Sequence, residues 1–101
     1  MNNVFMVVGR LTKDIELRYT KDNKAVCDAN LAINNAKDDV TFLKVSIWDK
    51  VAETTAKYCK KGDLVGIKGR LQNRCYEDEQ GEKKYITEVI VDKINSVINL
   101  L

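Results

Sequence analysis

The sequence predicts an all-β fold, a five-stranded barrel with one helix between strands 3 and 4. Five segments have the continuous apolar or alternating pattern of β-strands, whereas only "DKVAETTAKYCKKG" repeats apolar residues at helical spacing. Three strands precede this helix and two follow it. That order is expected for an OB barrel, whose binding surface lies on strands 2 and 3 and on the loops joining strands 1–2 and 4–5. A five-stranded sandwich and an SH3-like barrel are the alternatives, although neither needs a helix at this point.

The first three strands follow from their apolar patterns. Residues 4–11 are nearly all apolar, as expected of a strand covered on both faces, and the alternation over 15–19 suggests that this strand continues after a bend. The polar cluster "TKDNK" then predicts a turn. Residues 25–34 alternate, with Cys27 on the apolar face. Residues 40–48 have one apolar face and a second face that carries Phe42, Lys44, Ser46 and Trp48.

The predicted helix begins with Asp49 as its N-cap and ends before Gly62, which follows two lysines. Its apolar stripe consists of Val51, Thr55, Tyr58 and Cys59. A long strand over 64–76 follows the helix. The turn "DEQGEK" joins this strand to a last one over 85–94, which makes a hairpin.

The exposed face of the long strand is unusual because its charges are all positive. Alternate side chains share one face of a strand, and this face carries Lys68, Arg70, Gln72, Arg74 and Tyr76. Between residues 57 and 76 there are six Lys or Arg residues and one acid, Asp63. Folding does not require an exposed face to carry one sign of charge, so we expect a negatively charged partner.

The 101 residues suit one domain, 1–101, and the net charge of +2 is by itself weak evidence for a nucleic-acid partner. Three well-separated cysteines and no histidine argue against a disulfide framework and a zinc site. Cys27 and Cys75 follow the apolar parity of their strands and are predicted to be small core residues. The apolar run near the start is too short to span a bilayer and lacks the flanks of a signal peptide. We therefore expect a cytoplasmic protein without membrane association.

Single-stranded nucleic acid presents phosphates and unstacked bases, and a sequence-tolerant binder needs a positive groove for the first and aromatic rings for the second. The candidate stacking residues are Phe42, Trp48 and Tyr76. The candidate phosphate contacts are Lys44, Lys68, Arg70 and Arg74. Phe42 could instead turn into the core, and the parity of Trp48 could be lost where its strand meets the helix. Tyr76 could pair with Tyr85 across the hairpin. The same aromatic and basic combination on two strands favours binding.

Catalysis has little support, and we predict no enzyme activity, no metal and no cofactor. Without histidine, the usual hydrolase triad cannot be built, and "GDLVGIKGR" lacks the ending of a phosphate-binding loop. The remaining enzyme hypothesis is a metal-dependent nuclease that uses Asp38 and Asp39 or the acids at 77–79. These acids fall in polar, turn-like runs, where solvated loops are the simpler interpretation.

Three stretches resemble bacterial and phage single-stranded DNA-binding proteins: "NNVFMVVGRLTKDIELRYT", "VSIWDKVAETTAKYCKKGDLVGIKGRL" and "RCYEDEQGEKKYITEVIV". The resemblance implies an OB fold, usually a homotetramer, that coats single-stranded DNA on the nucleoid during replication, recombination and repair. Family stacking positions fall on Phe42, Trp48 and Tyr76. Family basic positions fall on Arg10, Lys44, Lys50, Lys61 and Arg74. The apolar first strand suits the subunit pairing of such proteins, in a tetramer or a dimer.

The sequence departs from the family pattern at three places. A further stacking aromatic is replaced near Lys37 in a shortened loop, which is expected to reduce affinity or site size. Ile15 stands where the family has proline. The sequence stops at Leu101, before the usual linker and acidic tip, as expected of a trimmed form or a naturally tail-less member from a phage or mobile element. A second hypothesis is therefore a tail-less OB-fold primosomal protein of replication restart, acting mainly through protein partners.

Overall fold

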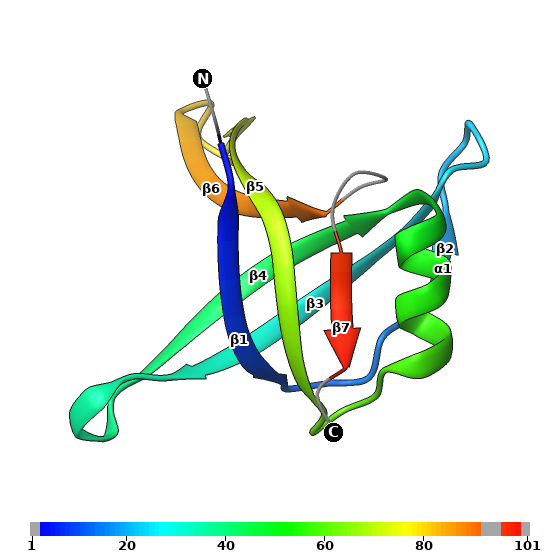
Figure 1. Ribbon diagram of the computed structural model, residues 1–101. Helices are drawn as coiled ribbons and strands as arrows, with labels where there is room; N and C mark the ends of the chain where they lie inside the picture. The colour runs from blue at the N-terminus through cyan, green and yellow to red at the C-terminus, as the bar shows by residue number, and fades with distance from the viewer. Residues whose placement is uncertain (1–2, 92–95, 100–101) are drawn as a thin grey trace.

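The computed structural model describes residues 3–91 and 96–99 (Figure 1). Its elements, in chain order, are β1 (Phe5–Leu11), β2 (Arg18–Tyr19), β3 (Ala25–Asn34), a 3-10 turn (Ala36–Asp38), β4 (Val40–Trp48), α1 (Asp49–Tyr58), β5 (Leu64–Glu77), β6 (Lys83–Val91) and β7 (Ser96–Asn99).

Five of these strands form a closed ring. Neighbouring strands pair in the order β1, β3, β4, β6, β5, and β5 pairs back onto β1. The pairing of β4 with β6 is parallel, and the other pairings in the ring are antiparallel. This is the five-stranded OB barrel with a helix after its third ring strand that the sequence predicts, so the fold prediction is confirmed. The two short strands add to the ring, β2 on β3 and β7 on β5.

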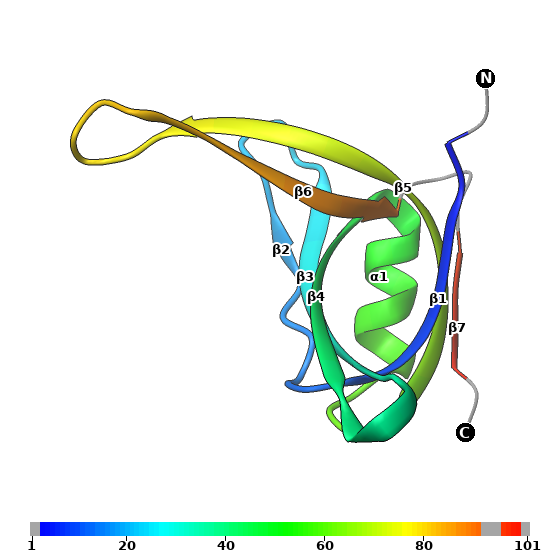
Figure 2. The same cartoon turned by 90° about the vertical axis from the view of Figure 1, so that its left-hand side faces the viewer.

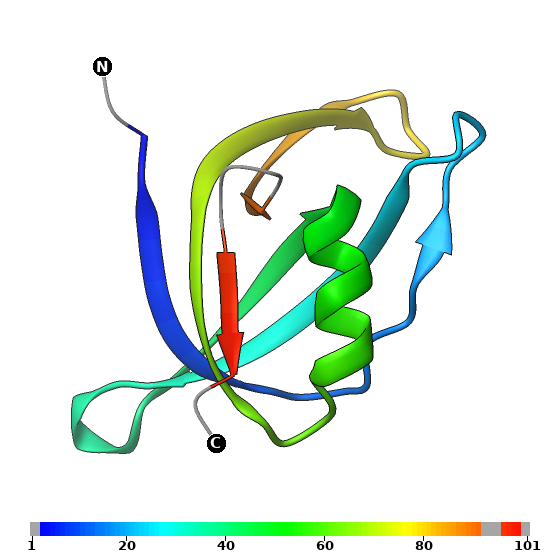
Figure 3. The same ribbon diagram turned by 45° about the vertical axis from the view of Figure 1, so that its right-hand side comes forward.

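The core fills the inside of this ring. Its fully buried side chains include Leu31, Ile47, Val65 and Val89. Figure 3 shows α1 beside the ring, where Ala52 and Thr55 are buried. The Cys27 thiol lies 3.9 Å from the carbonyl oxygen of Ala52, which joins β3 to the helix. Cys27 is therefore a core residue, as predicted.

The prediction that the first strand is covered on both faces is wrong for the single chain. Val4, Met6 and Val8 alternate with the inward-facing residues of β1, and each is more than half exposed. The expected continuation over 15–19 is also shorter, because only β2 is a strand. At the end of β1, both backbone groups of Leu11 bond to the segment before β5: the N–H of Leu11 donates to the carbonyl of Asp63, and the carbonyl of Leu11 accepts from the N–H of Gly62.

The helix differs from its predicted boundaries at both ends. Trp48 occupies the N-cap position without a side-chain capping bond, and Asp49 is already the first residue of α1, with a φ of 61°. The helix ends at Tyr58, where the N–H of Cys59 still bonds to the carbonyl of Thr55. Tyr58 is largely exposed, so it does not belong to the buried stripe.

The β5–β6 hairpin extends beyond the barrel (Figure 2). Cys75 is exposed here, so its prediction as a core residue is wrong. Beyond Gly69, the buried face of β5 opens to solvent, because this half of the strand no longer lies over the core. Tyr85 lies opposite Cys75, whereas Tyr76 lies opposite Lys84, so the two tyrosines are not directly paired. The predicted last strand is present to Val91, and residues 92–94 lie outside the described residues. The sequence reasoning did not identify β7.

Candidate nucleic-acid interface

A groove with a volume of about 630 Å³ lies on the outer face of the barrel. Its floor crosses four strands in one row, because the pairing registers place Asp28 of β3 beside Ser46 of β4, Ser46 beside Ile90 of β6, and Ile90 beside Arg70 of β5. These side chains point away from the core residues that alternate with them. The floor of the groove is therefore formed by the ring itself, where β3, β4, β6 and β5 lie side by side.

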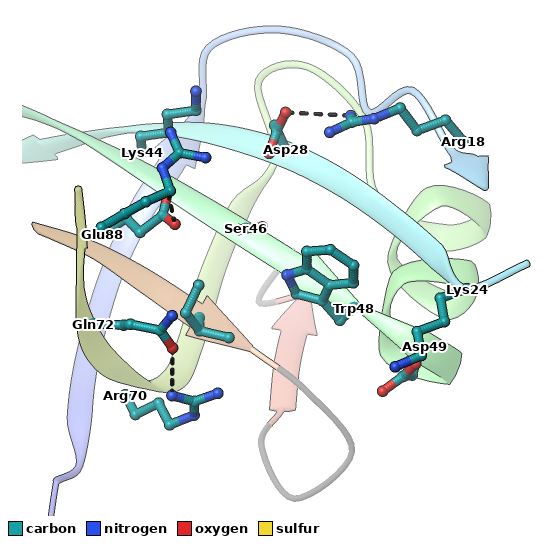
Figure 4. Close-up of a pocket in the computed structure, with 12 residues that line it drawn as sticks. Arg18, Lys24, Asp28, Lys44, Ser46, Trp48, Asp49, Arg70, Gln72 and Glu88 are labelled. Carbon is teal, nitrogen blue, oxygen red and sulfur yellow. Dashed lines mark hydrogen bonds and ion pairs between the residues drawn. The ribbon is translucent and has the colours of Figure 1, made fainter. Parts of the chain in front are cut away.

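Basic side chains outnumber acidic ones around this groove (Figure 4). The basic lining residues are Arg18, Lys24, Lys44, Arg70 and Arg74. The acidic lining residues are Asp28, Asp49 and Glu88. The excess of two positive charges gives the groove the sign needed for a polyanion.

Each of the three groove arginines contacts a neighbouring polar side chain. Arg18 Nη1 donates to Asp28 Oδ2 at 3.2 Å, and Arg70 Nη1 donates to Gln72 Oε1 at 2.7 Å. Arg74 Nε lies 4.0 Å from Glu88 Oε1. These contacts orient the guanidinium groups over the groove.

The predicted stacking residues lie along one strand and one hairpin. Trp48 is half-buried and lines the groove, so its outward parity is kept up to the helix junction. Phe42 is 72% exposed, which excludes the alternative that it turns into the core. It lines a second hollow of about 370 Å³, and Lys44 lines both hollows. Tyr76 is half-exposed and follows Arg74 on the same face of β5, outside the lining of the groove.

The predicted basic residues are only partly brought together. Lys44, Arg70 and Arg74 line the groove. Lys68 shares their parity but lies where β5 pairs with Met6 of β1 and with β7, away from the groove lining. Arg10 donates from Nη1 to the carbonyl of Gly62 at 3.0 Å.

The other two predicted basic residues lie beyond the groove. Lys50 is exposed in the first turn of α1. Lys61 lines a neighbouring hollow of about 430 Å³ together with Lys13 and Asp14, and its backbone N–H donates to the Asp14 carboxylate. Arg18 and Asp28 line this hollow as well as the main groove, so their ion pair stands between the two.

Five charged groove residues were missed by the sequence reasoning: Arg18, Lys24, Asp28, Asp49 and Glu88. The parity of β3 and β6 predicts that Asp28 and Glu88 face outward, but acidic side chains are not expected on a surface that binds a polyanion. Arg18 and Lys24 could be found only from the fold, because β2 and the turn after it reach the groove by pairing with β3.

The two buried cysteines, Cys27 and Cys59, have raised thiol pKa values. Burial, aided by the nearby Asp28 carboxylate, raises the pKa of Cys27 to about 11, and burial near Asp63 also raises the pKa of Cys59. Both thiols therefore stay protonated near neutral pH. Within residues 3–91 and 96–99, no three Cys, Asp or Glu side chains gather as a metal-binding group, and no helix is long and apolar enough to cross a membrane.

Known proteins similar to this chain share one description. The model of the single-strand binding protein family matches residues 1–97. Single-stranded DNA-binding protein B of Bacillus subtilis (strain 168) is 47% identical over 100 residues, which cover 93% of this chain and 88% of that protein. Single-stranded DNA-binding protein 1 of Lactococcus lactis is 48% identical over 98 residues, and the Streptococcus mutans protein is 46% identical over 98. The matches to these two cover 91% of this chain but only 65% and 59% of the relatives. With a family match over nearly its whole length, the chain belongs to the single-strand binding protein family.

Proposed function

We propose that this chain binds and protects single-stranded DNA without catalysis and with little sequence preference, during replication, recombination and repair. The observation that carries the proposal is the groove on the ring, where Trp48 stands among Lys44, Arg70 and Arg74. The names of the family and of its curated relatives support the same ligand.

Single-stranded DNA fits this groove by two separate interactions. Each base stacked on an aromatic ring contributes about 1–3 kcal/mol, and this term tolerates any sequence because every base has a π-face. Phosphates bound by Lys and Arg release counterions, so affinity falls as salt rises. The strand would run from Trp48 past Lys44 to Phe42, because these three side chains follow one another on the outer face of β4. Tyr76 would extend the stacking surface along the hairpin.

The basic residues outside the groove would extend the path of the strand. Lys61 would continue it through the neighbouring hollow, which Arg18 and Asp28 also line. Lys50, Arg10 and Lys68 would contact phosphates only on a strand that wraps beyond the groove.

We further propose that residues 1–101 form a single domain that self-associates through β1, as a homotetramer or a dimer, in the cytoplasm. Val4, Met6 and Val8 present an apolar edge to solvent, and burying such an edge is favourable at about 25 cal/mol per Å². Met6→Glu should yield a folded monomer, because Met6 lies opposite Lys68, which can accept a carboxylate neighbour. Analytical ultracentrifugation would measure the change, and an unchanged mass would contradict this assembly.

The experiment for DNA binding uses the single tryptophan. Oligo(dT) is titrated into the protein while the fluorescence of Trp48 is followed, and the titration is repeated with a duplex of equal length and at higher salt. We expect strong quenching by oligo(dT), little by duplex, and weaker binding with salt. Absence of binding, checked by a second method, would favour instead a module that acts through protein partners. Binding without quenching would support the function and remove Trp48 from the contact surface.

A further inference from the structure

The groove contains a carboxylate whose surroundings are unusual for a DNA-binding surface. Glu88 is only 6% exposed, and it lines the groove from the middle of β6. Within the described part of the chain, its only polar contact is Arg74 Nε at 4.0 Å, beyond hydrogen-bond distance. Among the described side chains, no buried nitrogen or oxygen lacks a hydrogen-bond partner, so the Glu88 oxygens still reach solvent. A ligand that covers this groove would displace that water, and it has to supply donors to Glu88 because desolvation without them is costly.

The residue beside Glu88 can donate hydrogen bonds, whereas the Glu88 carboxylate can only accept them. Gln72 lies directly across from Glu88 in the pairing of β5 with β6, so the two side chains stand next to each other on the same face (Figure 4). Arg70 Nη1 donates to Gln72 Oε1 at 2.7 Å. Because an arginine can only donate, this contact assigns the oxygen of the Gln72 amide and leaves its NH₂ group for another partner.

Together these two side chains present one donor, from Gln72, beside the two acceptor oxygens of Glu88. The Watson–Crick edge of guanine has the complementary order, with the O6 acceptor followed by the N1–H and N2–H₂ donors. Bases of single-stranded nucleic acid are unpaired, so this edge is free to contact protein. Thymine offers only N3–H between two carbonyl oxygens, which would face the carboxylate unfavourably.

We propose that Glu88 and Gln72 form a guanine-preferring subsite in the groove, in which Glu88 accepts from N1–H and N2–H₂ and Gln72 donates to O6. This inference rests on the proposed binding of single-stranded DNA and adds a base preference to it. The subsite reads one base edge, while the aromatic rings hold the other bases without regard to sequence. A matched bidentate contact discriminates against the wrong base by about 5- to 150-fold.

The test compares three strands that differ in one base. Each is an oligo(dT) of the shortest length that saturates the protein, with guanine, hypoxanthine or thymine at its centre, in a lithium buffer. Hypoxanthine lacks only the N2 amino group of guanine. We expect wild-type protein to bind the guanine strand about tenfold more tightly than the thymine strand, with hypoxanthine in between. Equal binding of all three strands would overturn the subsite while leaving the proposed function intact, whereas no binding of any strand would overturn both.

Two variants assign the preference to these residues. Glu88→Gln removes the charge at nearly constant shape and replaces one of the two acceptor oxygens by a donor, so it should lower the guanine-to-hypoxanthine ratio. Gln72→Ala, at an exposed position that tolerates truncation, should lower the guanine-to-thymine ratio. Glu53→Gln, on the exposed side of α1, removes the same charge away from the groove and should keep both ratios.

Thermal melting of each variant checks that it is folded. A folded Glu88→Gln protein that keeps the wild-type ratio would overturn the assignment. If that variant does not fold, an unchanged ratio in Gln72→Ala would do so.

Discussion

Replacing Phe42 by alanine should separate DNA binding from stability. The ring is 72% exposed, so its removal leaves no cavity in the core, and we expect the free energy of unfolding to change by no more than about 0.5 kcal/mol. A fully buried phenylalanine would cost about 3–5 kcal/mol. Loss of one stacked base, in contrast, costs about 1–3 kcal/mol, which is a 5- to 150-fold weaker Kd.

The assay is fluorescence anisotropy of labelled oligo(dT), together with urea denaturation of each protein. Phe42→Tyr keeps the ring and should bind like the wild type, whereas Phe42→Leu keeps apolar volume without a π-face and should bind like Phe42→Ala. Trp48 lies six residues along β4, or about 20 Å at roughly 3.3 Å per residue, so its quenching by DNA should persist in all three variants. A stable Phe42→Ala protein with wild-type affinity would refute the stacking role.

Four further predictions concern charge, packing and thiols. Lys44→Ala should lower the slope of log K against log[salt] by about 0.7 in magnitude, which corresponds to one lost phosphate contact. An unchanged slope in salt titrations would contradict that contact. Gly69→Ala should destabilise the barrel by about 1–3 kcal/mol, because the new Cβ would lie 2.6 Å from the carbonyl oxygen of Ile90. Urea denaturation measures this change, and wild-type stability would show that the backbone of β6 can move to accommodate the Cβ. The pKa of Cys27 is raised from 9.0 to about 11 in the folded state, so the unfolded chain loses this proton at lower pH than the folded one. The free energy of unfolding should therefore decline as pH rises from about 9 to 11. Cys27→Ala should flatten this decline, as denaturation at each pH can check. A thiol reagent should modify Cys75 in the native protein before the two buried cysteines, as peptide mass spectrometry can check.

The number of ring strands and the place of the helix among them could be predicted from the sequence, because most of the strands keep a period of two where one face is buried. On β4, the alternation of Val45 and Ile47 with Lys44 and Ser46 specifies which side chains face outward. The same alternation predicts that Trp48 and Phe42 lie on the outer face of this strand, as they do. Parity is informative there because the strand lies over the core along most of its length.

Parity was uninformative where a strand leaves the core or coils around it. Cys75 has the parity of Ile67, but the hairpin beyond the barrel has no core to face. Lys68 has the parity of Arg70, yet the two lie on different parts of the ring. At Lys68, β5 pairs with β1 and β7, whereas at Arg70 it pairs with β6. The exposure of Met6 could not be predicted either, because an apolar strand gives the same pattern whether the chain or another subunit covers it.

The acids of the groove illustrate a different limit. The alternation of β6 places Glu88 on the outward face of its strand, but its burial depends on Gln72 and Arg74, which reach it from β5. A sequence read one strand at a time cannot show that an outward residue is enclosed by its neighbours across the sheet.

The placement of β6 between β4 and β5 has a consequence for synthesis of the protein. In the ring, β4 and β5 do not pair with each other, and the groove spans both. A nascent chain that has emerged only as far as Glu77 therefore contains Phe42, Trp48 and Tyr76 but lacks the strand that completes the groove. The surface forms when residues up to Val91 leave the ribosome and β6 enters the gap between β4 and β5. We therefore expect a chain that lacks β6 to bind DNA weakly, and full affinity to require the closed barrel.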